Sequence, residues 1–251
     1  MFRLRAGTRS AVLAALIAIS GCGASTLPSV HSEPERLSLG REEAAKGDYL
    51  DAIELLKTYV DNNAGSAEVD HALYLLGDCY LHTHDWASAA IQFERLLREF
   101  PESDSSAASS YHLGIAYNGQ ARPPDFDQEY TVKAIDQWRH YLVTYPGHCM
   151  NADAEHDIEN ARMKLATKLV ETGDLYVKLS QLRAARAYYG KVEADFSDLP
   201  QLGDAWVGLA RCDVLEHNPD AAIEKLKAVE QRFAGRPVAE TAARERARLV
   251  N

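Results

Sequence analysis

The sequence has few of the features that mark an enzyme, a membrane-spanning protein or a disulfide-rich protein. Its 251 residues include only 4 cysteines, too few for a framework of disulfides. It contains neither a phosphate-binding loop of the Gly-x-x-x-x-Gly-Lys type nor a Gly-x-Ser-x-Gly motif. The apolar run from Ala11 to Ile19 is too short to span a bilayer as a stable anchor. The sequence therefore indicates no catalytic activity and no transmembrane helix.

Positive charge is also scarce. The chain has 27 Lys and Arg against 37 Asp and Glu, a net charge of −10. Arg3, Arg5 and Arg9 precede the apolar run, so removal of that segment would leave an even more acidic protein. This balance argues against nucleic acid as a partner and against direct attraction to anionic lipid.

The sequence contains no complete set of metal ligands. Two clusters could be drawn as ligand sets, namely His82 with His84 and Asp85, and His148 with Cys149 and His156. Neither supplies four regularly spaced ligands, so we interpret them as exposed turn residues and expect no metal and no other cofactor.

What the sequence does contain is a repeated pattern of small and large residues. Gly77, Tyr80, Ala89 and Phe93, followed by Pro101, fit the tetratricopeptide repeat of two antiparallel helices. Two helices approach closely only where a small residue faces a large one. Such repeats bury a continuous core by stacking on their neighbours, and the proteins they form are generally scaffolds.

The pattern recurs five times. Gly40, Gly77 and Gly114 are spaced by 37 residues. The other repeats pair Ala52 with Leu56, Ala134 with Trp138, Gly173 and Ala185 with Tyr189, and Leu209 and Ala222 with Leu226. The sequence therefore predicts an all-α tetratricopeptide solenoid of five helical hairpins.

Two breaks in the period and one terminal segment complete the predicted fold. Between Gly114 and Ala134 the chain has eight extra residues, which predicts a long loop inside the third hairpin. After Pro146, apolar residues recur every three or four positions as far as Leu179, which predicts one central helix of roughly thirty residues. The segment from Arg236 to Val250 has the pattern of a capping helix.

The amino terminus has the pattern of a lipoprotein export signal. Residues 1–21 form the expected signal peptide, and Ile19-Ser20-Gly21-Cys22 resembles the lipobox of bacterial lipoproteins, which implies acylation of Cys22. The alternative is a soluble secreted protein whose signal happens to end near a cysteine. Residues 22–36 are expected to be a flexible tether and residues 37–251 the solenoid, with halves of about 37–147 and 148–251.

The remaining cysteines are an odd number, so they cannot all pair within one chain. Cys79 and Cys212 fall on the first helices of separate repeats and are predicted to be small core residues. Cys149 follows Pro146 in a loop and is predicted to be exposed.

One stretch resembles a known family, the BamD-type outer membrane protein assembly factors. The resemblance is closest from Pro123 to Ala134 (Pro-Pro-Asp-Phe-Asp-Gln-Glu-Tyr-Thr-Val-Lys-Ala) and continues through the long helix to Asp195-Phe196-Ser197-Asp198. It implies a non-catalytic scaffold lipoprotein on the periplasmic face of the outer membrane that supports folding and insertion of β-barrel proteins. Gly23, where an Asp would retain the protein at the inner membrane, agrees with that location by the same resemblance.

The resemblance also implies partners. These are a periplasmic domain of the barrel-forming subunit, accessory lipoproteins and unfolded β-barrel segments, with the membrane reached only through the lipid. The barrel-forming subunit would dock on the carboxy-terminal half near Arg183 and Arg186. Close to these residues the sequence departs from the family, since Leu179-Ser180-Gln181 replaces its Lys-Arg-Gly turn.

Repeat geometry predicts a groove in the amino-terminal half. Positions two, five, nine and thirteen of each repeat line the concave face, and here they give Arg41, His71, Tyr74, Asp78, His82, Tyr111 and Ile115. Tyr74 and Tyr111 are equivalent, so their rings could form a surface for an extended peptide. Alternatively, both rings pack against neighbouring helices.

Two other functions remain open from the sequence. The first is a different periplasmic tetratricopeptide adaptor, for example one that coordinates cell-wall synthesis with envelope constriction. The second is a hydrolase or ligand-binding lipoprotein, which would need an enclosed pocket with convergent polar groups.

Overall fold

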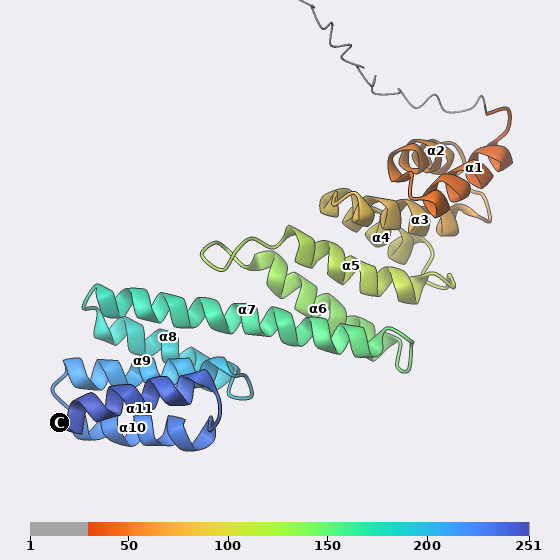
Figure 1. Cartoon of the computed structure of the whole chain (residues 1–251). Helices are drawn as coiled ribbons and strands as arrows, with labels where there is room; N and C mark the ends of the chain where they lie inside the picture. The colour runs from red at the N-terminus through yellow and green to blue at the C-terminus, as the bar shows by residue number, and fades with distance from the viewer. Residues whose placement is uncertain (1–29, 251) are drawn as a thin grey trace, which may run out of the picture.

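The computed structural model describes residues 30–250, and all regular structure in that range is helical. The helices stack into an elongated array that runs from α1 and α2 at one end to α9, α10 and α11 at the other (Figure 1). Their bounds are α1 Glu33–Lys46, α2 Tyr49–Asn62, α3 Val69–His82, α4 Trp86–Glu99, α5 Ser106–Gln120, α6 Glu129–Thr144, α7 Asn151–Lys178, α8 Leu182–Asp195, α9 Gln201–Leu215, α10 Pro219–Arg232 and α11 Pro237–Val250.

Five hairpins form as predicted, from α1–α2 to α9–α10, and the predicted pairs of small and large residues hold them together. A Cβ atom on Gly77 would lie 2.7 Å from the ring of Phe93, and one on Gly173 would lie 2.4 Å from Tyr189. The alanines of the pattern are equally close-packed, since Ala89 and Ala185 have no exposed surface. The fold is therefore a tetratricopeptide solenoid.

Four of the five hairpin turns use one residue in the left-handed backbone region. Gly47 has a φ of 88°, and His84, Ser180 and His217 take the equivalent place with φ of 60°, 57° and 61°. Side chains other than glycine adopt this region at a cost of roughly 1 kcal/mol. The third hairpin lacks such a turn because a long loop joins α5 to α6.

That loop, residues 121–128, is an ordered connection to the central helix. The Gln128 side chain is 6% exposed, and its Nε2 donates to the carbonyl oxygens of Arg122, Pro123 and Phe126. Lys168 of α7 donates to the Pro124 and Phe126 carbonyl oxygens at 2.8 and 2.5 Å. The loop is therefore bonded to the middle of α7.

The predicted central helix is confirmed. α7 has 28 residues and packs against α6 and also against α8 and α9. It lies alongside α6 over its first half and α8 over its second half (Figure 1). This single helix joins the two halves of the solenoid.

The ends of the solenoid differ slightly from expectation. The first helix begins at Glu33, before the expected residue 37, because the Ser32 side chain accepts a hydrogen bond from the Glu35 amide and Pro34 suits the first turn. At the other end, α11 covers α10 and α9, as predicted for a cap. Within residues 30–250, no helix is both long and apolar enough to cross a membrane.

The predictions for the three cysteines in the described range are confirmed. Cys79 and Cys212 are buried and Cys149 is exposed. Burial raises the pKa of the Cys79 thiol to about 12, so this group stays protonated and unreactive. Cys22 lies outside the described residues, so its acylation stays a prediction.

Candidate partner-binding surfaces

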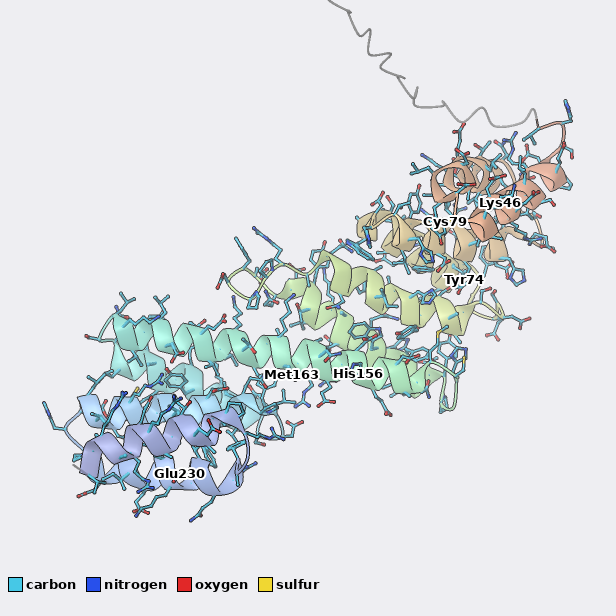
Figure 2. The ribbon with its side chains drawn as sticks, viewed as in Figure 1. Lys46, Tyr74, Cys79, His156, Met163 and Glu230 are labelled. Atoms are coloured by element: carbon cyan, nitrogen blue, oxygen red, sulfur yellow. The ribbon has the colours of Figure 1, made fainter. Side chains whose placement is uncertain are left out.

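The amino-terminal candidates gather on the side of α3 that faces α5. His71, Tyr74, Asp78 and His82 share one face of the helix by their spacing. His71 Nδ1 lies 3.1 Å from the Ser105 hydroxyl at the start of α5. Figure 2 labels Tyr74 where the second hairpin meets the third. The predicted residues therefore belong to one surface, formed where the first helices of adjacent repeats meet.

Asp78 is the centre of this surface, together with a residue that sequence reasoning missed. Asp78 lies 3.7 Å from His82 Nε2 and 3.8 Å from Nδ1 of His112, which belongs to α5. The His112 ring stacks on Tyr74, with centroids 5.7 Å apart. Burial lowers the pKa of His112, and the charge of Asp78 only partly opposes this effect. His112 is therefore mainly neutral at pH 7.

The Tyr111 ring is buried, as the packing alternative expects. Tyr111 is 8% exposed, its ring lies 5.7 Å from that of Tyr141, and its hydroxyl donates to Asp157 of α7 at 2.9 Å. The long helix covers the position that would be open in a regular repeat. Tyr74 and Tyr111 consequently do not form a pair of exposed rings, and the packing alternative holds for Tyr111.

Arg41 links the first two repeats. Its Nη2 donates to the Glu68 carboxylate at 2.6 Å, just before α3 begins. Both side chains are about half exposed, at 47% and 51%, so this ion pair contributes little to stability. Arg41 can therefore exchange this partner for a ligand at small cost, and its binding role stays a prediction.

The two arginines predicted in the carboxy-terminal half differ from each other. Arg186 makes ion pairs within the fold, with Asp213 of α9 at 2.5 Å and with Glu216, the residue that follows α9, at 2.6 Å. Asp213 is 5% exposed, so Arg186 satisfies a buried carboxylate. Arg186 would have to give up these ion pairs to bind a partner, and its binding role stays a prediction. Arg183 is exposed near the start of α8, and its binding role stays a prediction.

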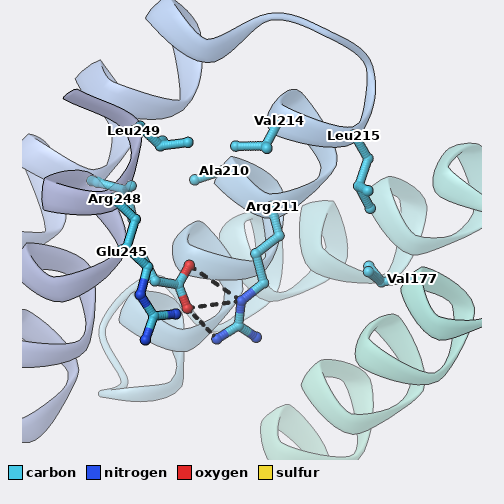
Figure 3. A pocket seen from close by; sticks show the side chains of 9 residues that line it. Val177, Ala210, Arg211, Val214, Leu215, Glu245, Arg248 and Leu249 are labelled. Atoms are coloured by element: carbon cyan, nitrogen blue, oxygen red, sulfur yellow. Dashed lines mark hydrogen bonds and ion pairs between the residues drawn. The ribbon is translucent and has the colours of Figure 1, made fainter. Parts of the chain in front are cut away.

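The carboxy-terminal half also contains an apolar groove between α7, α9 and α11 (Figure 3). Its volume is about 360 Å³. Val177 and Leu215 stand on facing elements in Figure 3, and Leu215 is 52% exposed. The lining residues are Val177, Ala210, Arg211, Val214, Leu215, Leu226, Glu245, Arg248 and Leu249. We call this feature the carboxy-terminal groove.

Charged side chains from α7, α9 and α11 form a row of ion pairs at the carboxy-terminal groove. Arg211 of α9 donates to Glu245 of α11 at 2.6 and 3.0 Å, and its other terminal nitrogen lies 3.8 Å from Asp174 of α7. Asp174 also accepts a hydrogen bond of 2.7 Å from the buried Tyr189 hydroxyl. The hydrogen bonds to Glu245 raise the pKa of Arg211, so the guanidinium stays charged.

Sequence reasoning missed this groove, although its signal was present. Asp174 follows Gly173 as Asp78 follows Gly77, which places it at position nine of its repeat. Arg211 stands 37 residues after Asp174. The position count that gave the amino-terminal candidates would therefore also have found these residues.

The chemistry of both surfaces suits binding. Among residues 30–250, no group of three or more His, Cys, Asp or Glu side chains is arranged to hold a metal ion. The carboxy-terminal groove has apolar walls, and its only acid, Glu245, is paired with an arginine. These features define a helical-repeat protein with two candidate binding surfaces.

The chain belongs to a family of outer membrane lipoproteins. The model of the YfiO family, described as "Outer membrane lipoprotein", matches residues 37–212. This match extends from α1 into α9 and includes the inserted loop and the long helix. Family membership associates the chain with the outer membrane and with the assembly lipoproteins of that membrane.

Individual relatives are distant. The outer membrane protein assembly factor BamD of Caulobacter vibrioides is 23% identical over 193 residues, and the match covers 74% of this chain but only 63% of that protein's length. A tetratricopeptide repeat protein from Parabacteroides merdae is 16% identical, with a TM-score of 0.39 and coverage of 86% of this chain and 72% of that chain. A thermophilic repeat protein of Thermus thermophilus is 17% identical, with a TM-score of 0.35 and coverage of 87% and 99%.

Proposed function

We propose that the chain is a non-catalytic scaffold lipoprotein that supports folding and insertion of β-barrel proteins into the outer membrane. The observation that supports this most is the family match over residues 37–212, which includes the inserted loop and the 28-residue helix. These two features distinguish the chain from a regular tetratricopeptide array. The name of the Caulobacter relative, an outer membrane protein assembly factor, agrees with the proposal.

The proposed scaffold has a lipid anchor at one end and a partner site at the other. Acylation at Cys22 would hold the protein on the periplasmic face of the outer membrane, with residues up to Ser32 as the tether. The carboxy-terminal half would hold a periplasmic domain of the barrel-forming subunit and contact accessory lipoproteins. The α3–α5 surface around Asp78 would receive unfolded segments of β-barrel substrates.

Affinity purification tests this function. Membranes are solubilised in a mild detergent, and the full chain is captured with an antibody, because a tag would lie beside either Cys22 or the carboxy-terminal groove. Recovery of a large barrel protein with periplasmic repeat domains is expected. Recovery of cell-wall synthases without it would contradict the proposal and favour a cell-wall adaptor.

A further inference from the structure

The carboxy-terminal groove continues into a smaller, cationic hollow on α11. This hollow has a volume of about 160 Å³ and is lined by Thr241, Arg244, Glu245 and Arg248. It shares Glu245 and Arg248 with the groove, so an apolar surface and a charged surface adjoin. Arg244 and Arg248 are one helical turn apart and face the same side of α11.

The arginines of this region fall into two groups. Arg211 and Arg246 each make paired hydrogen bonds to a carboxylate, the first to Glu245 and the second to Glu230. In the described part of the chain, Arg244 bonds only to the Thr241 hydroxyl, at 3.1 Å, and Arg248 forms no ion pair. Both side chains are exposed. In a chain of net charge −10, two neighbouring guanidinium groups that have no carboxylate partner among residues 30–250 are well placed to attract an anionic group.

The apolar part of the site is also open. Val214 and Leu249 are half-buried and pack on the core below the groove, whereas Leu215 is 52% exposed at its rim. Leu175 and Leu179, near the end of α7, are 52% and 55% exposed. The carboxyl ends of α7, α9 and α11 lie on the same side of the molecule, at the left of Figure 1. Apolar side chains of a ligand would therefore be buried beside the two arginines.

We propose that the carboxy-terminal groove, with Arg244 and Arg248, is a docking site for a short segment of a partner protein that alternates apolar residues with carboxylates. Leucine-sized side chains of the segment enter the groove, and its Asp or Glu side chains pair with the two guanidinium groups. This assignment rests on the proposed function, because it takes the carboxy-terminal half as the half that holds a partner. It names the chemistry of that partner, which the family match does not supply.

Peptide binding to the full chain in lipid nanodiscs tests the site. The probe is a fluorescein-labelled peptide of twelve residues with two leucines spaced by three positions and two glutamates beside them, measured by fluorescence anisotropy. The double variant Arg244→Glu/Arg248→Glu is expected to weaken binding at least tenfold, and Leu215→Ser several-fold. The control is Arg236→Glu, at the exposed residue just before α11, which has half the charge change of the double variant and should weaken binding less than twofold.

Two comparisons keep the result specific. A peptide with lysines in place of the glutamates should bind at least tenfold more weakly, and circular dichroism melting should show that all variants are folded. Absence of binding, equal affinity for the two peptides, or unchanged affinity in the double variant would overturn the site. If the barrel-forming subunit is still recovered by affinity purification in that case, only the groove assignment fails; if it is not recovered from the unaltered chain, the proposed function fails instead.

Discussion

The close packing of Gly114 against Trp138 yields a quantitative prediction. A Cβ atom at position 114 would lie 2.2 Å from Nε1 and 2.4 Å from Cδ1 of the indole, which is 1% exposed and has no room to move. Overpacking of this kind costs about 3 kcal/mol. Displacement of the Trp138 ring also breaks the hydrogen bond from the indole to the Tyr111 carbonyl oxygen, which costs about 1 kcal/mol. The better helix propensity of Ala offsets about 1 kcal/mol of this total.

Gly114→Ala should therefore lower the free energy of unfolding by about 3 kcal/mol, measured by urea denaturation with circular dichroism. Gly190→Ala is the matched control, because a Cβ atom at this helical glycine would meet nothing within 4 Å. It should stabilise the protein by about 0.5–1 kcal/mol through helix propensity alone. If both substitutions had the same effect, the role of small residues in setting the helix spacing would be refuted. A smaller cost of Gly114→Ala in a Trp138→Leu background would show that the two positions are coupled.

Three further predictions concern polar groups. Lys168→Met should remove both hydrogen bonds to loop 121–128. Amide hydrogen exchange in that loop should then become about tenfold faster, equivalent to about 1.4 kcal/mol, while the amides of α7 stay protected. An unchanged exchange rate in the loop would show that Lys168 does not hold it. Arg186→Ala should lower the free energy of unfolding by about 2 kcal/mol, because it removes one of the two cations that pair with the buried Asp213 carboxylate, Lys225 being the other. The exposed Arg183→Ala should change it by less than about 0.5 kcal/mol, and thermal unfolding compares the two variants. Burial lowers the pKa of His112 in the folded state, so the unfolded chain binds a proton at this histidine at higher pH than the folded chain does. The free energy of unfolding should therefore fall as the pH drops below 6.5. His112→Gln should flatten that part of a plot of unfolding free energy against pH.

The hairpins and the central helix could be predicted because their signals are local. Gly77 and Phe93 lie within one repeat, and the apolar period after Pro146 runs without interruption to Leu179. The start of α1 was misplaced because the prediction used apolar periodicity, whereas Ser32 begins the helix through a capping hydrogen bond.

The candidate sites were harder to predict because they depend on contacts between repeats. Tyr111 is buried by α7, a helix longer than the repeat pattern requires, and its hydroxyl partner Asp157 is 46 residues away. Arg186 reaches Asp213 across 27 residues. No local pattern distinguishes such an arginine from an exposed one like Arg183.

Exposed side chains differ in whether the fold gives them a partner. His82 stacks on Tyr49 with ring centroids 4.4 Å apart, so even this exposed histidine is positioned by the preceding repeat. Arg248, by contrast, has no carboxylate partner in residues 30–250 and adjoins an apolar groove. The difference between these two side chains became visible only once the helices had been placed in space.

The proposed scaffold function is tested most directly by depletion. The chain is placed under a repressible promoter, and the folded fraction of outer membrane β-barrel proteins is measured by heat-modifiable gel mobility as its level falls. We predict that folded barrels decline before any change in cell-wall incorporation, and that the unaltered chain restores them but Cys22→Ala does not. Unchanged barrel folding together with an early septation defect would contradict the account.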